Sequence, residues 1–186
     1  IAEISVNDSR RQRMDDLADE IRSCTRCSGM NVKAETQAAP GFGSVHSPVV
    51  LVGQSLCRQC MEAQEPFYKG SGILLDRSLA KAGIEKQDLF ITNVVHCHPP
   101  ENRDSPPVWI KRCSPYLHRE LEIVQPRLVI GLGEDARTAV TDYYRQARHP
   151  VSPALMFAKH PSWVLRQHDP GLEQEYVDAL AQALTW

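Results

Sequence analysis

Pro48-Val49-Val50-Leu51-Val52-Gly53 is an unbroken apolar run closed by a glycine, and this stretch decides the fold. A short run without polar alternation is typical of a strand that is buried on both faces of a parallel sheet. Residues 89–95, 127–133 and 154–158 have the same character. Together these segments predict a central four-stranded parallel sheet.

Helical patterns separate the expected strands. In the first of them, Met14, Leu17 and Ile21 share one apolar stripe. Strands that alternate with helices predict an α/β fold with both faces of the sheet covered, a three-layer α/β/α architecture. A chain of 186 residues suffices for one such domain, and no shift in composition divides residues 1–186. The expected helices cover residues 10–23, 71–82, 107–124, 134–145 and 171–185.

Composition narrows the class of protein. The formal charge of -2 argues against a protein that coats nucleic acid over its whole surface, although a local basic face remains compatible with it. No stretch is apolar enough to span a membrane, and Ile1-Ala2-Glu3 shows no charged-then-apolar signal pattern. Six cysteines are a low density for a disulfide scaffold of this length. We therefore expect a cytoplasmic monomer.

Three segments are expected to meet at one cleft. In parallel sheets the ligand binds beyond the carboxyl ends of the strands. The loop after Gly53, the stretch 93–103 and the turn His160-Pro161-Ser162 all follow expected strands. The polar residues of these segments are therefore candidates for a binding site.

Side chains near these strand ends suit recognition of a flat heterocycle. Phe67 follows a proline among glycines and can stack on such a ring, and Asn93 offers one acceptor and two donors to the edge of a pyrimidine. His160 can donate to an oxygen that gains negative charge. Each residue also has a purely structural interpretation, as a core aromatic, a loop-tying amide or a solvated imidazole.

Four cysteines indicate a metal site. Cys24 and Cys27 are spaced C-x-x-C, and Cys97 and Cys113 follow in two separate segments. Thiols grouped in this way bind a metal ion or an iron–sulfur cluster more often than they form disulfides in an intracellular chain. The spacing alone leaves zinc as the alternative to a cluster.

Assembled, these motifs resemble those of the iron–sulfur uracil-DNA glycosylases, family 4 of the uracil-DNA glycosylase superfamily. The resemblance covers residues 10–185 and is carried mainly by the stretch 92–103, Thr-Asn-Val-Val-His-Cys-His-Pro-Pro-Glu-Asn-Arg. It is also carried by Cys24-x-x-Cys27, Pro66-Phe67-x-x-Gly70-x-Gly72, Cys113-x-Pro115-Tyr116-Leu117 and His160-Pro161-Ser162.

The resemblance implies a DNA glycosylase that removes uracil or a related deaminated base from DNA. It implies that a structural [4Fe–4S] cluster ties the N-terminal helix to the domain. Extrusion of the base from the stack is physically required for such chemistry. The residues that match functional positions of the family are Cys24, Cys27, Cys97 and Cys113 as cluster ligands, Phe67, Asn93 and His160 around the base, and Ser162 and Arg166 beside the DNA backbone.

One loop departs from the family. The family's water-activating loop reads Gly-Glu-Ala-Pro-Gly, and this chain has Gly53-Gln54-Ser55-Leu56-Cys57 there. Gln54 can position water but cannot act as a base, and Ser55 supplies no charge. Loss of a positioned general base commonly costs a factor of about 10²–10⁴. The alternative function is therefore a weakened or inactive relative that binds a modified base.

Cys57 and Cys60 form a second C-x-x-C inside this loop. They can be inert small residues, a redox-active dithiol that makes DNA binding respond to oxidation, or a site whose Cys57 thiolate attacks the sugar. A bare C-x-x-C is a weak signal. We favour the inert interpretation over the nucleophile.

Overall fold

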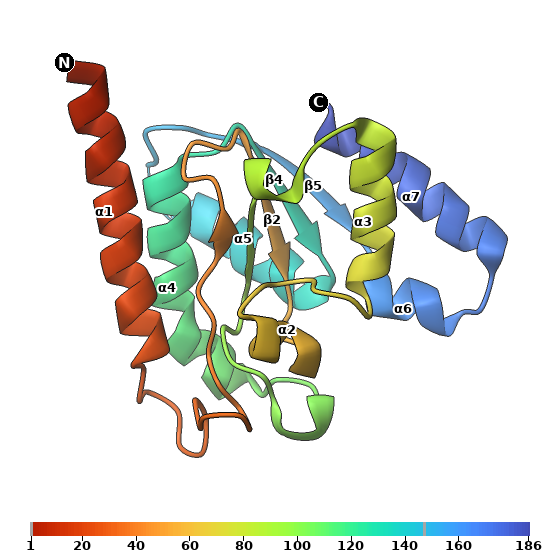
Figure 1. Ribbon diagram of the computed structural model, residues 1–186, viewed down its shortest axis with the longest axis horizontal. Coiled ribbons are helices and arrows are strands. Elements are labelled where there is room, and N and C mark those ends of the chain that lie inside the picture. Colours follow the sequence, from red (N-terminus) through yellow and green to blue (C-terminus); the bar gives the residue numbers. More distant parts are fainter. Residues whose placement is uncertain (1, 147) are drawn as a thin grey trace.

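The computed structural model describes residues 2–146 and 148–186, and it has the expected three layers (Figure 1). The central sheet has five strands in the order β1-β3-β2-β4-β5. The strands are β1 (Phe42–Gly43), β2 (Val49–Gly53), β3 (Phe90–Asn93), β4 (Leu128–Leu132) and β5 (Ala154–Ala158). The helices are α1 (Ala2–Arg22), α2 (Arg58–Ala63), α3 (Gly72–Ala82), α4 (Pro107–Val124), α5 (Glu134–Gln146), α6 (Pro161–Arg166) and α7 (Pro170–Leu184), with 3₁₀ turns η1 (Lys86–Asp88) and η2 (Pro100–Asn102).

Alternate residues of the buried strands point to opposite helix layers. Val50 and Val52 of β2 pack in the cluster that holds α1, α4 and α5, whereas Leu51 packs in the cluster that holds α3 and α7. In Figure 1, α1 lies beside α4, and α3 lies beside α7. Both faces of the sheet are therefore covered by helices, which explains why its strands lack polar alternation.

The four expected parallel strands are present, but the sheet contains a fifth strand at one edge. A fifth strand, β1, pairs antiparallel with β3 through Phe42 opposite Ile91. The other neighbours are parallel. A strand of two residues next to a glycine carries no periodic signal, so the sequence pattern could not indicate it.

Two short helices were also missed. Residues 58–63, expected to be loop, form α2, whose N-cap is Cys57. The expected turn at His160-Pro161-Ser162 begins α6, and His160 is its N-cap. In addition, α1 begins eight residues before the expected position 10, at Ala2. No helix within residues 2–146 and 148–186 is long and apolar enough to cross a membrane.

Candidate active site

The register of the sheet brings the expected site residues together at the carboxyl ends of its parallel strands. Gly53 at the end of β2 pairs with Asn93 at the end of β3. The loop after β2 is held there, since Val94 N–H donates to the Gly53 carbonyl at 3.0 Å and Val95 N–H to the Gln54 carbonyl at 2.9 Å. His160 follows the carboxyl end of β5, on the same side of the sheet. The site thus forms where parallel-sheet ligands bind.

These residues line one pocket, which we call the base pocket. Its volume is about 130 Å³, many times the roughly 10–15 Å³ that one water needs. All seven non-cysteine residues expected at the site contribute to it: Gln54, Ser55, Phe67, Asn93, His160, Ser162 and Arg166. Of the other lining residues, Cys57, Cys60, Asn102 and Arg103 lie in segments that were expected at the cleft, whereas Ser71 and Asp104 were not expected there.

Phe67 is held in a strained conformation against the pocket wall. Its φ of 54° lies in the left-handed region, which is costly for a bulky residue. The ring is buried, and its centroid lies 5.9 Å from that of His160. A Cβ on Gly53 would lie 2.6 Å from Phe67 Cζ and 2.5 Å from Asn93 Oδ1. Glycine at position 53 is what allows the aromatic ring and the amide to approach each other.

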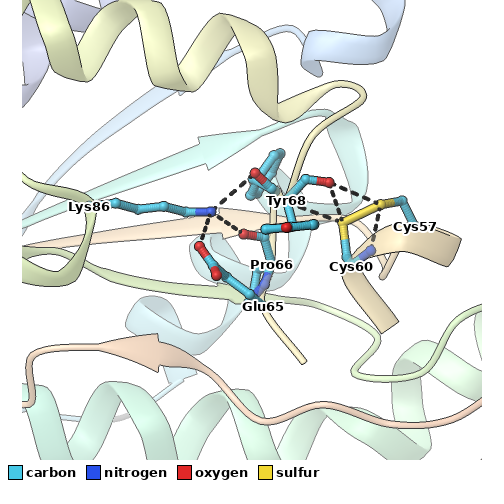
Figure 2. A network of polar contacts seen from close by, with 7 residues as sticks. Cys57, Cys60, Glu65, Pro66, Tyr68 and Lys86 are labelled. Atoms are coloured by element: carbon cyan, nitrogen blue, oxygen red, sulfur yellow. Dashed lines mark hydrogen bonds and ion pairs between the residues drawn. A yellow bond between two sulfur atoms is a disulfide. The ribbon is translucent and has the colours of Figure 1, made fainter. Parts of the chain in front are cut away.

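A polar network fixes the backbone around Phe67 (Figure 2). Lys86 Nζ donates to the Pro66 carbonyl at 2.8 Å and to the Phe67 carbonyl at 3.1 Å, and it pairs with Glu65 at 2.7 Å. Lys86 is distant in sequence and belongs to no motif, so only the tertiary structure reveals its role. It contributes to holding the strained loop in place.

A disulfide joins Cys57 and Cys60 on the other side of this loop (Figure 2). Tyr68 N–H donates to Cys60 Sγ at 3.4 Å, so the bridge contacts the residue after Phe67. The bridge bears on one of the three interpretations of this C-x-x-C, the nucleophile. With both sulfurs in the bridge, neither is a thiolate that could attack the sugar.

Asn93 has an unused amide group. Its side chain is only 4% exposed and lines the base pocket, yet it forms no hydrogen bond to another side chain or backbone group within the described residues. A buried amide that tied the loop together would have such a partner. Its donors and acceptor are instead available to a ligand.

His160 is a neutral imidazole with a free donor. Its Nδ1 accepts from the Ser162 N–H at 3.1 Å, which leaves the proton on Nε2. Burial, with a smaller contribution from the charge of Arg166, lowers the pKa of His160 to about 4. A neutral Nε2–H can therefore donate a hydrogen bond at neutral pH.

We expect His160 to remain uncharged at neutral pH and to titrate near pH 4. Because its pKa is lower in the folded protein than the ordinary 6.5, its contribution to stability is complete above pH 6.5 and is lost as the pH falls toward 4. ¹⁵N NMR of labelled histidine tests both the tautomer and the midpoint. A midpoint near 6.5 would contradict this assignment.

Gln54 is oriented by a residue from another element. Its Nε2 donates to Asp135 Oδ2 at 3.0 Å, from the first turn of α5. The Gln54 Oε1 therefore remains available to accept a hydrogen bond. Asp135 follows β4 without any motif, so no sequence pattern indicates this contact.

The four remaining cysteines line a second cavity. Met30, Val95 and Trp109 supply its apolar walls, and α1 ends beside it. Burial, with further contributions from the neighbouring Cys113 and Cys24, raises the pKa of the Cys97 thiol to about 12. In the described residues, no three His, Cys, Asp or Glu side chains are arranged to hold a single metal ion. The residues concerned are Cys24, Cys27, Cys97 and Cys113.

Comparison with known proteins defines the class. Residues 40–185 match the sequence model of the Uracil DNA glycosylase superfamily. A solved structure of a putative uracil DNA glycosylase from Methanosarcina acetivorans has the same fold, with a TM-score of 0.54. It is 11% identical, and the match covers 80% of this chain and 98% of that one. The fold of the chain is thus that of this superfamily.

Curated relatives identify the family within that class. The type-4 uracil-DNA glycosylase of Archaeoglobus fulgidus is 38% identical over an alignment of 180 positions, which covers 89% of this chain and 88% of the relative. That of Pyrobaculum aerophilum is 32% identical over 89% of this chain and 90% of the relative. The chain belongs to the type-4 uracil-DNA glycosylases.

Proposed function

We propose that this protein hydrolyses the N-glycosidic bond of uracil, or of a related deaminated base, in DNA as a step of base excision repair. The observation that carries the proposal is the base pocket. A buried aromatic ring, an unused amide and a neutral imidazole meet there, at the carboxyl ends of the parallel strands. Its partner is DNA, and we propose that it acts as a monomer in the cytoplasm.

Each pocket residue has a role in this reaction. The base is extruded from the stack. Phe67 stacks on the extruded base, and Asn93 pairs with its imide edge. His160 Nε2–H donates to the base oxygen that gains charge as the bond to the sugar breaks. Ser162 and Arg166, at the pocket mouth on α6, face the DNA backbone.

We propose that Cys24, Cys27, Cys97 and Cys113 hold a [4Fe–4S] cluster. The donor set fits, since four thiols surround one apolar cavity. A zinc ion would require sulfurs gathered at about 2.3 Å around one point. Within the described residues no three of these side chains are arranged to hold a single metal ion, whereas four thiols are the ligand set of a [4Fe–4S] cluster. The cluster would serve as a structural brace between α1 and the segments that carry Cys97 and Cys113.

Uracil-containing single- and double-stranded oligonucleotides test the function. After incubation with excess holoprotein, alkali should cleave the strand at the uracil position, and matched oligonucleotides with cytosine there should stay intact. Absence of scission from a preparation with a full cluster would refute the glycosylase.

The second candidate is a protein that binds a modified base without releasing it. Two observations favour it: Gln54 occupies the position of the family's carboxylate, and a disulfide borders the pocket. It predicts tight binding of the same oligonucleotides without scission. If the bridge makes binding redox-responsive, reduction should change the DNA affinity, and Cys57→Ser should abolish that change.

A further inference from the structure

The loop after β2 leaves the reaction without a carboxylate, yet the base pocket contains one. Asp104 is the only acidic residue among the described residues that line it. Two nearby candidates are already engaged, since Glu65 pairs with Lys86 at 2.7 Å and Glu62 with Arg58 at 3.3 Å. Neither glutamate lines the pocket.

Asp104 faces the same space as the residues that act on the base. It belongs to the segment between η2 and α4, and it lines both the base pocket and a hollow beside it. Gln54 and His160 also line both. Asp104 is exposed and has no hydrogen bond or ion pair within the described part of the chain. Its carboxylate is thus unengaged and can accept a proton.

The hollow beside the base pocket offers polar partners to a water molecule. Gln54 and Asp104 both line it. Because the amide nitrogen of Gln54 is engaged by Asp135, its Oε1 is the available acceptor. An amide oxygen and a carboxylate that line one space provide two of the two to four polar partners that a bound water requires.

We propose that Asp104 is a catalytic residue that takes over the role of the missing loop glutamate, an inference that rests on the proposed glycosylase function. The C1′–N1 bond breaks, and its electron pair leaves with the base, whose oxygen accepts the His160 hydrogen bond. Water held by Gln54 attacks C1′, and its proton passes to the Asp104 carboxylate. The base leaves as an anion that takes up one proton from solvent, and Asp104 returns its proton to solvent. The products are then the free base and an abasic sugar. Asp135 is a positioning residue that orients Gln54.

Asp104→Asn tests this role under single-turnover conditions with a uracil-containing oligonucleotide. Removing the carboxylate should slow uracil release by about 10²-fold or more. Asp142→Asn makes the same change on α5 at an exposed position outside both hollows, and it should keep the wild-type rate. Gln54→Glu added to Asp104→Asn should restore much of the lost rate.

The DNA affinity of Asp104→Asn provides a second readout, which should not fall with the rate of uracil release. Loss of a negative charge beside DNA should leave unchanged, or tighten, binding of an uncleavable 2′-fluoro-deoxyuridine oligonucleotide. Release within about threefold of wild type for Asp104→Asn would overturn the inference. The inference would also be overturned if the wild type released no uracil and the Gln54→Glu variant released it. If neither the wild type nor Gln54→Glu releases uracil, the proposed function itself fails and this inference fails with it.

Discussion

Replacing Asn93 by alanine is expected to lower kcat/KM for uracil excision by about 10–10²-fold, because the imide edge of the buried base loses its hydrogen-bond partner, at a cost of about 1–3 kcal/mol. Asn93 is 4% exposed and has no partner within the described residues, so its amide is available to the edge of the base. The measurement is single-turnover uracil release at saturating and subsaturating protein.

Asn102→Ala is the matched control for this variant. Asn102 lines the same pocket but is exposed at its rim, so its loss should cost far less. Melting temperatures should show that both variants fold. Equal rates for Asn93→Ala and the wild type would show that the Asn93 amide does not take part in the recognition of uracil.

Replacing Cys113 by serine is expected to cause the largest loss of stability. Cys113 is buried, and the His96 N–H donates to its Sγ at 3.2 Å. Structural metal sites can contribute roughly 10–16 kcal/mol, comparable to the 5–15 kcal/mol that stabilise a whole domain. The variant should lose the broad visible absorption of a cluster, and protease cleavage should begin near the end of α1.

The disulfide offers the control for this second variant. The Cys57→Ser, Cys60→Ser double variant removes two sulfurs from the chain without touching the four-thiol cavity. It should keep the visible absorption and nearly the same melting temperature. A Cys113→Ser protein with an unchanged spectrum would exclude Cys113 as a ligand.

The sequence predicted the parts of the fold that repeat a pattern. Buried strands such as β2 are continuous apolar runs, and long helices such as α4 have an apolar stripe, so both could be located. The two-residue β1 and the six-residue α2 and α6 are too short to show a period. Their positions depend on pairing with β3 and on the N-caps at Cys57 and His160.

Residues of the site were predictable where a strand end or a motif carried them. Phe67, Asn93 and His160 met these conditions. Lys86, which holds the Phe67 loop, and Asp135, which orients Gln54, belong to no motif and act only through tertiary contact. Their contributions arise from packing between elements far apart in the chain, which local sequence does not encode.

Free uracil released from a uracil-containing duplex, quantified by mass spectrometry in a single turnover, tests most directly whether the base pocket catalyses excision. We expect one uracil per duplex from the wild-type holoprotein, no cytosine from the matched cytosine duplex, and a much slower release from Asn93→Ala. Tight binding of the uracil duplex with no free uracil would contradict catalysis in this pocket and would leave recognition as its function.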